Sequence, residues 1–167
     1  MNKLLTGTLG ILLLVLCDGA ISAERELARD ILGIRLAMPK DAVQKRLEEI
    51  GKFVRDERKR QQIWEVQDPS FSHLIVGFDA NDRLRYVTAV AREDAEAKRI
   101  RYADIGDTET ARQAGDVAIK NFNYEWTLTA TKENKAGLVI ARGRDPEFLS
   151  TYSLKALAGE GGGGDGE

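Results

Sequence analysis

The first clear pattern in the chain is an apolar stripe at helical spacing within residues 38–51. Val43, Leu47 and Ile50 recur at intervals of four and three residues, and polar side chains fill the positions between them. Gly51 comes directly after this stripe, where a glycine in the left-handed conformation commonly ends a helix. The pattern therefore predicts an amphipathic helix over residues 38–51.

The next residues predict strands. We expect a strand over residues 60–67, a break at 68–70 and a hairpin over 71–91. Residues 79–83 supply turn residues that tolerate a left-handed backbone. In the first arm of the hairpin, the apolar residues of one parity should share a face: Leu74, Val76 and Phe78.

The second half of the chain predicts another set of strands. Apolar and polar residues alternate strictly over residues 121–131, which is the period of a half-buried strand. Further strands are expected over 137–142 and 148–154, with turns at 132–135 and 144–146.

Three segments outside these strands are less regular. An Asp-Thr pair at 107–108 is placed to cap a short helix over 109–114 that ends at Gly115. Residues 24–34 fit a short helix or a lead-in strand equally well, because their periodicity does not separate the two. Residues 93–105 are charged and predict a connector with helical turns.

The predicted elements indicate an α+β fold in which short helices pack on one face of an antiparallel meander sheet. Two helix-plus-three-strand halves, 24–92 and 93–158, are a more detailed version of this fold. Each half would have a helix ended by glycine, Gly51 or Gly115, and then a tryptophan, Trp64 or Trp126. The alternative is a single continuous sheet without an internal repeat.

The N-terminal residues have the layout of a secretory signal. Lys3 precedes an apolar run from Leu4 to Leu16, and small residues follow up to Ala23. We therefore predict a signal peptide over 1–23 and a periplasmic or secreted mature protein. Lipid anchoring through Cys17, the only cysteine, is the alternative, although Leu16 stands where a small residue usually precedes a modified cysteine.

Composition narrows the class of function. The formal net charge is −2 and charges of both signs are mixed along the chain, so no nucleic-acid footprint is expected. The densest basic run is Arg55, Arg58, Lys59 and Arg60, which fits a solvated loop or sheet edge, or else a patch for an anionic partner. No spanning segment is expected after the signal, and the Gly/acidic tail at 159–167 is expected to be disordered.

The sequence offers little chemistry. His73 is the only histidine, and cleavage after Ala23 would leave no cysteine, so we predict no cofactor and no zinc or copper site. Ser72 adjoins His73 but should point to the opposite face of a strand. Residues 79–82 superficially resemble a calcium loop, yet they lack a bidentate glutamate at the required spacing.

The segment Gly33–Arg92 resembles the beta-lactamase-inhibitor-protein-like superfamily. That group includes the small outer-membrane lipoprotein of the barrel-assembly machinery. The resemblance is carried by eight positions: Met38, Val43, Gly51, Trp64, Phe78, Asp79, Arg83 and Leu84. It implies helices packed on an antiparallel sheet, an envelope setting and protein binding.

The aromatic residues are the remaining lead to function. Tyr86, Tyr124, Trp126 and Tyr152 are candidates for a partner-binding face, and the alternative is that the aromatic stripe is core. The favoured function is an exported, non-enzymatic protein-binding or structural module of the bacterial cell envelope, with an unidentified envelope protein as partner. A small-molecule or lipid carrier with a cavity between helix and sheet, and a hydrolase with an acid pair, are the alternatives.

Overall fold

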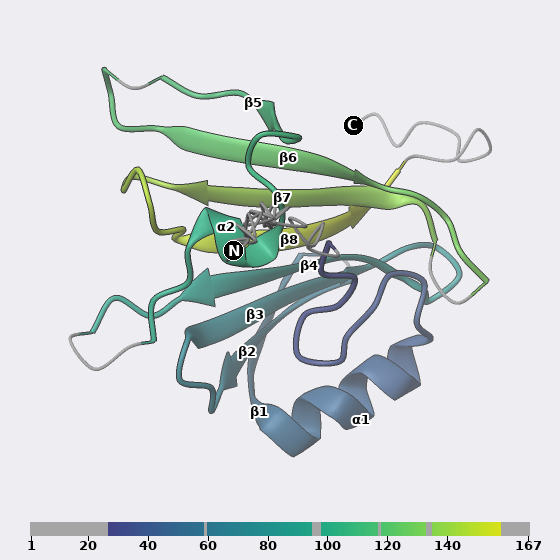
Figure 1. The fold of residues 1–167 in the computed structure, drawn as a ribbon. Helices are drawn as coiled ribbons and strands as arrows, with labels where there is room; N and C mark the ends of the chain where they lie inside the picture. The colour runs from purple at the N-terminus through teal and green to yellow at the C-terminus, as the bar shows by residue number, and fades with distance from the viewer. Residues whose placement is uncertain (1–26, 59, 95–97, 117, 133–134, 158–167) are drawn as a thin grey trace, which may run out of the picture.

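The computed structural model describes residues 27–58, 60–94, 98–116, 118–132 and 135–157. In this part the chain is a mixed α+β fold whose eight strands form one antiparallel sheet, in the order β1-β2-β3-β4-β8-β7-β6-β5 (Figure 1). The elements are α1 Lys40–Ile50, β1 Gly51–Arg58, β2 Gln61–Val66, β3 Phe71–Phe78, β4 Leu84–Ala91, α2 Tyr102–Ile105, β5 Arg112–Gln113, β6 Phe122–Leu128, β7 Gly137–Gly143 and β8 Thr151–Ala156. The expected signal peptide, Cys17 and the Gly/acidic tail lie outside the described residues.

The predicted amphipathic helix is confirmed as α1. Val43 and Leu47 are fully buried, and Ile50 packs against the core. The expected left-handed conformation of Gly51 is wrong, because its φ is −164° and the residue begins β1 in extended form. A glycine is needed there for a different reason: a Cβ atom would collide with the carbonyl oxygen of Glu65 on β2.

The basic segment after α1 is the edge strand β1. It pairs with β2 through register shifts between Phe53 and Arg55 and between Asp56 and Arg58, and apart from its first residue it is exposed. Lys59 lies outside the described residues. Bulges and charges of this kind protect an exposed edge from pairing with other strands.

The hairpin formed by β3 and β4 matches the prediction closely. Its turn contains Asp82 in the left-handed region, at φ 53°. The Asp79 carboxylate accepts the backbone N–H groups of Asn81, at 2.8 Å, and Arg83, at 3.0 Å, which fixes the turn. The apolar residues of one parity are all buried, as expected: Leu74, Val76 and Phe78.

The segment before α1 is neither the short helix nor the strand that the sequence left open. Residues 27–39 form turns with two isolated bridges, one between Ile31 and Ile34 and one between Pro39 and Arg83. Leu32 and Ala37 have positive φ, and the backbone folds back on itself. Ile31, Ile34 and Leu36 are nevertheless buried, so this segment supplies core side chains without regular structure.

The helix predicted over residues 109–114 is wrong. The described helix of this half is α2, one turn earlier in the connector, and Gly106 rather than Gly115 follows it. The Asp107 carboxylate accepts a hydrogen bond from the N–H of Glu109, and the Asp107 backbone carbonyl accepts one from the Thr110 hydroxyl. These residues therefore form a turn that leads into β5. Local side-chain hydrogen bonds of this type compete with helix formation.

The remaining strands lie close to where alternation predicted them, with different ends: β7 ends at Gly143 rather than 142, and β8 ends at Ala156 rather than 154. β6 stops at Leu128 rather than 131, and β8 starts at Thr151 rather than 148. The Asp145 carboxylate accepts the N–H groups of Glu147 and Phe148, and this turn holds residue 148 outside the strand.

The two sets of four strands have matching registers. Trp64 on β2 lies opposite Leu74 on β3, and Trp126 on β6 lies opposite Val139 on β7. The sets meet where β4 pairs with β8 (Figure 1). Across the sheet, the first set runs from β1 to β4, and the second then runs backwards from β8 to β5. Each set contains four strands, one more than the sequence indicated, because the edge strands β1 and β5 were not expected.

Candidate binding surfaces

Strand pairing assigns every sheet residue to one of two faces. On one face, the buried side chains belong to a hydrophobic cluster that also includes residues of α1, α2 and the segment 27–39. The opposite face carries Ile63, Ile75 and Ile140, which alternate with that cluster along β2, β3 and β7. We call it the outward face. Ile63 and Ile140 are each 8% exposed but are not part of the cluster, so neighbouring side chains on their own face shield them.

One row of paired residues crosses the outward face from edge to edge. From β1 to β5 it contains Arg55, Ile63, Ile75, Thr88, Ser153, Ile140, Glu125 and Arg112. At its centre the hydroxyl oxygens of Thr88 and Ser153 lie 2.9 Å apart and share a hydrogen bond. Isoleucines flank this pair and an arginine stands at each end. The row therefore has an apolar and hydroxyl centre with charged ends, Arg55 at one end and the Glu125–Arg112 ion pair at the other.

Tyr86 occupies the outward face beside this row. It pairs with Gly77 across β3 and β4, and its ring lies over that glycine, since a Cβ atom at Gly77 would collide with the ring. Partial burial raises the pKa of the Tyr86 hydroxyl, and the nearby Arg85 and Arg58 oppose this shift. The ring is thus a fixed, half-buried contact surface rather than a mobile side chain.

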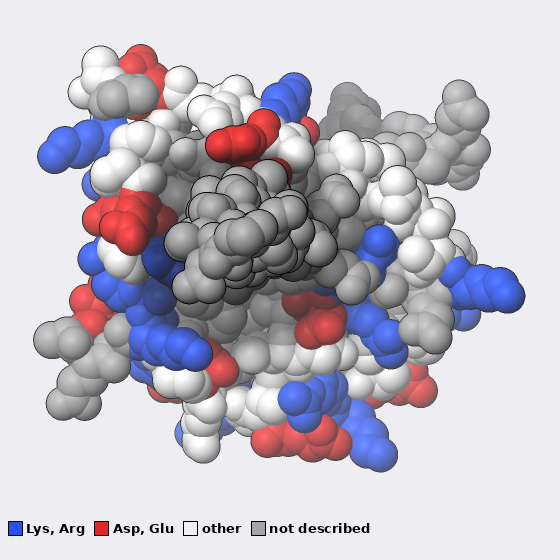
Figure 2. All heavy atoms as spheres, in the orientation of Figure 1, with Lys and Arg blue, Asp and Glu red and all other residues white. Residues whose placement is uncertain are grey.

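Basic side chains outnumber acidic ones on the outward face. By strand pairing the basic residues are Lys52, Arg55, Arg58, Arg112, Arg142 and Lys155, and the acidic ones are Glu65 and Glu125. Glu57, at the bulge of β1, also reaches this face, where its carboxylate accepts from the Gln61 amide at 3.4 Å and lies near Tyr86. Arg112 forms an ion pair with Glu125 at 2.7 Å. Figure 2 views the other side of the molecule, which carries α1 and α2, and there lysine, arginine and acidic side chains are interspersed. The outward face is therefore basic in a chain whose formal net charge is −2.

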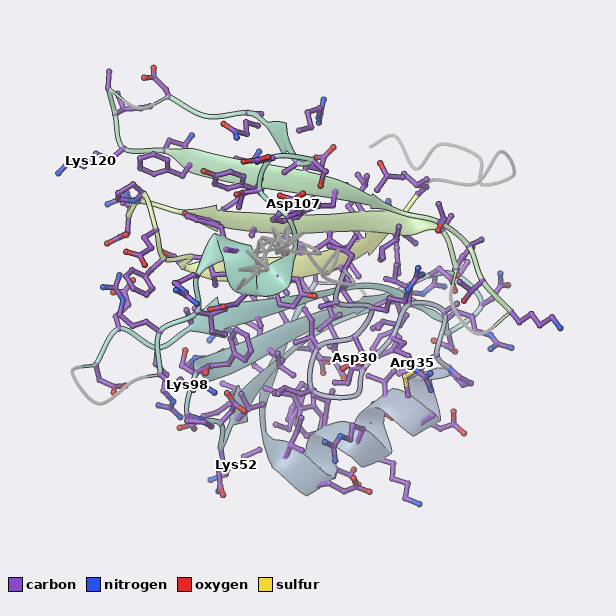
Figure 3. All side chains as sticks on the ribbon, in the orientation of Figure 1. Asp30, Arg35, Lys52, Lys98, Asp107 and Lys120 are labelled. Carbon is purple, nitrogen blue, oxygen red and sulfur yellow. The ribbon has the colours of Figure 1, made fainter. Side chains whose placement is uncertain are left out.

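The four aromatic candidates do not form one face. Trp126 and Tyr152 are 6% and 3% exposed and belong to the hydrophobic cluster, and Tyr124 packs against that cluster. The Trp126 indole N–H donates to the carbonyl oxygen of Asp107 at 2.7 Å, near the centre of Figure 3. These three aromatic residues therefore belong to the core or pack against it, which was the alternative, and only Tyr86 lies on the outward face.

The hydroxyl groups of Tyr152 and of Tyr102, a buried tyrosine of α2, form hydrogen bonds within the protein. The Tyr152 hydroxyl donates to the carbonyl oxygen of Ala28 at 3.3 Å, and burial raises its pKa strongly. The Tyr102 hydroxyl donates to the carbonyl oxygen of Asp145 at 3.1 Å, and burial raises its pKa to about 12. These tyrosines anchor the N-terminal segment and α2 rather than facing a partner.

His73 and Ser72 are closer than the sequence suggested. A register shift between Phe71 and His73 brings the His73 Nδ1 atom to 3.1 Å from the Ser72 hydroxyl oxygen, which itself donates to the carbonyl oxygen of Val90. No described contact orients the imidazole from its other nitrogen, as a catalytic triad would require. Within the described residues, no group of three or more His, Cys, Asp or Glu side chains is arranged to hold a metal ion.

The outward face was not predicted from the sequence, because on each strand its residues are those that alternate with the conspicuous apolar ones. Periodicity identified Leu74 and Val76 as core, and it leaves Ile75 and Thr88 as apparent solvent positions. A usable signal was present in β3, where Ile75 is apolar although its neighbours already supply the buried parity. The pairing of β4 with β8 is not local in sequence, so the complete row could not be assembled from periodicity.

Comparison with known proteins adds no further identification: no family model matches the chain, and no curated protein or solved structure matches it. In the part of the chain that the structure describes, no helix combines the length and apolar character needed to cross a membrane.

Proposed function

We propose that this chain is an exported, non-enzymatic protein-binding module of the bacterial cell envelope that uses the outward face of its sheet. In this proposal α1, α2 and the segment 27–39 cover the other face and leave the outward face open. The carrying observation is the row from Arg55 to Arg112, where apolar and hydroxyl side chains lie in the centre and charged ones at the ends. Protein interfaces commonly have such an apolar centre and polar rim.

The charge of this face supports an acidic partner surface. Arg55, Arg58 and Lys155 are exposed and form no ion pair with another described residue. Opposite charges across an interface accelerate association and discriminate against other partners. Tyr86 adds a large side chain that loses little conformational freedom on binding, because its ring already lies against Gly77.

The layout of residues 1–23 and the resemblance of Gly33–Arg92 to an envelope superfamily support the export part of the proposal. The carrier alternative receives less support. Val43 and Leu47 of α1 are 0% exposed and belong to the same cluster as the sheet residues beneath them, which leaves them in contact with protein rather than with a ligand space.

A matched photocrosslinking pair tests the proposal. A benzophenone amino acid replaces Lys155 on the outward face in one variant and Lys45 on α1 in the other, both of which are exposed lysines. In intact cells that naturally express the protein, the Lys155 variant should yield one discrete protein adduct and the Lys45 variant should not. Adding Arg55→Glu and Arg142→Glu should reduce that adduct severalfold, because these changes reverse the charge of the face.

Two results would contradict the proposal: no adduct from position 155, or the same adduct from both positions. N-terminal sequencing of the mature protein tests export separately. We expect it to begin just after Ala23, and an intact Met1 in the purified envelope fraction would contradict the signal-peptide prediction.

A further inference from the structure

A groove of about 990 Å³ lies at one end of the sheet. Its walls come from the residues that follow β4, from Arg99, from the start of β6 and from the β7–β8 turn. Figure 3 labels Lys120 on this side of the molecule, where it points away from the start of β6, and Figure 2 shows lysine and arginine side chains gathered along the same left-hand side.

The floor of the groove is apolar and partly aromatic. Phe122 and Phe148 are half-buried, and Leu149 is buried beneath them. The Arg99 guanidinium lies 3.9 Å from the centre of the Phe148 ring and donates to the Asp145 carboxylate at 3.2 Å. Because the ring and the carboxylate both hold Arg99, this wall is fixed before any ligand binds.

The acidic side chains of the groove are largely occupied. Asp145 accepts the N–H groups of Glu147 and Phe148 as well as Arg99, and these interactions, the backbone ones first, hold the pKa of its carboxyl group below the ordinary value. Asp94 lies 3.9 Å from the Arg92 guanidinium. Glu93 is the remaining carboxylate among the lining residues.

The cations of the groove are only partly occupied. Arg92 donates to the carbonyl oxygens of Asp68, at 2.8 Å, and Val66, at 3.1 Å, so its guanidinium is held by the backbone at the end of β2. Lys120 and Arg144 are exposed and form no ion pair with another described residue. Lys120 also has a φ of 51°, a left-handed conformation that costs free energy for a residue other than glycine. Such strain often accompanies a functional position.

We propose that this groove binds a carboxylate attached to a flat apolar group. The apolar group would lie on Phe122 and Phe148, and the carboxylate would be bound by Lys120 and Arg144. The same chemistry occurs at the C-terminus of a peptide that ends in an aromatic residue and in a free arylalkanoic acid. The site adjoins the outward face, because Arg144 also lines a smaller hollow together with Arg142 and Thr151, but the proposal does not depend on the function proposed above.

Titration of the full-length mature protein with three probes, followed by ¹⁵N NMR, tests this site. The probes are 3-phenylpropionate, the peptide acetyl-Gly-Gly-Gly-Phe with a free carboxylate, and the same peptide as its C-terminal amide. We expect saturable shifts at the amides of Phe122 and Phe148 with at least one carboxylate probe, and roughly tenfold weaker binding of the amide, because a hydrogen-bonded charge is lost. Binding of only one carboxylate probe would support the site and identify the peptide terminus or the free acid as the source.

A double variant separates specific recognition from general charge attraction. Lys120→Asn, which tolerates the left-handed backbone, combined with Arg144→Gln should weaken carboxylate binding about tenfold or more. The control Lys132→Gln removes an exposed cation from the β6–β7 connection, outside the groove, and should leave binding unchanged. The absence of saturable shifts in the parent protein, or equal affinities for the double variant and the control, would overturn the proposal.

Discussion

The two halves of the sheet differ in the helix and the aromatic side chains that contribute to the hydrophobic cluster. In the first half, α1 spans eleven residues and buries Val43 and Leu47. In the second half, α2 has only four residues, and Tyr102, Tyr124 and Trp126 form a chain of ring contacts at centroid distances of 4.5 and 6.2 Å. The half with the shorter helix therefore contains a stack of aromatic side chains in the hydrophobic cluster or packed against it.

The two tryptophans show the consequence most directly. Trp64 and Trp126 have equivalent strand partners, but the ring that packs edge-on against Trp64, Phe53, lies on the sheet edge and is 43% exposed. The Trp64 indole N–H donates to the Gln62 side chain at 3.3 Å, whereas that of Trp126 donates to the Asp107 backbone at 2.7 Å. The second half thus depends more on its tryptophan than the first half does.

Truncating each tryptophan should give the largest difference between the halves. Trp126→Ala should lower the free energy of unfolding by about 3–5 kcal/mol, since it removes a buried ring and leaves the Tyr124 ring without its stacking partner. Trp64→Ala should cost less, because the ring that packs against Trp64 is the exposed Phe53 at the sheet edge. Urea unfolding of both variants, with Trp→Phe at each position as a milder matched change, measures the difference. An equal or larger loss for Trp64→Ala would contradict this assignment.

Much of the first half could be predicted from sequence because its signals are local. The stripe of Val43 and Leu47 defined α1, and the turn residues around Asp79 defined the hairpin. The same reasoning failed at residues 109–114, where the only apolar side chains are the small ones of Ala111 and Ala114. The capping residue Asp107 instead forms a turn with Glu109 and Thr110. Capping signals without an apolar stripe are weak evidence for a helix.

The candidate site was predicted less well than the fold. Periodicity shows which residues share a face, but it does not show which strands become neighbours. Tyr86 and Tyr152 lie on the adjacent strands β4 and β8, yet they occupy opposite faces of the sheet. Tyr86 pairs with Lys155, whereas Tyr152 pairs with Ala89, a residue of the opposite parity along β4. Grouping them required the register, which depends on contacts between residues far apart in the chain.

The glycines that follow the two helices should give the next largest contrast. At Gly51 a new Cβ atom would collide with the backbone of Glu65, which cannot move without disturbing the pairing of β1 and β2. At Gly106 the nearest atoms belong to the side chains of Leu27, at 2.9 Å, and Trp126, at 3.1 Å, which can shift. We expect Gly51→Ala to lower the free energy of unfolding by about 1–3 kcal/mol, and Gly106→Ala by less.

Thermal or urea unfolding of the two alanine variants checks this order. Both glycines have extended backbone, with φ of −164° and −170°, so backbone strain does not distinguish them. A larger loss for Gly106→Ala would show that the aromatic stack cannot adjust, and that the second half is the more rigidly packed of the two.

The turns of the two central hairpins give the smallest contrast. Asp79 and Asp145 each accept two backbone N–H groups, but Asp145 also accepts a hydrogen bond from Arg99. The backbone hydrogen bonds and Arg99 hold the pKa of Asp145 below its ordinary value of about 3.9. A group whose pKa is lower in the folded state stabilises the fold above its unfolded pKa, and this contribution disappears as the pH falls through its folded pKa.

Arg99→Gln should therefore raise the midpoint of the Asp145 carboxyl titration, followed by ¹³C NMR below about pH 5, without removing the backbone hydrogen bonds of the turn. Lys132→Gln is the matched control and should leave the Asp145 midpoint unchanged, because within the described residues no contact joins this exposed cation to the β7–β8 turn. The rise should be modest, since solvent screens this exposed pair. If the Asp145 midpoint is unchanged, the backbone N–H groups alone account for its lowered pKa. The β7–β8 turn would then be held in the same way as the β3–β4 turn, and Arg99 would serve the groove only through its contact with Phe148.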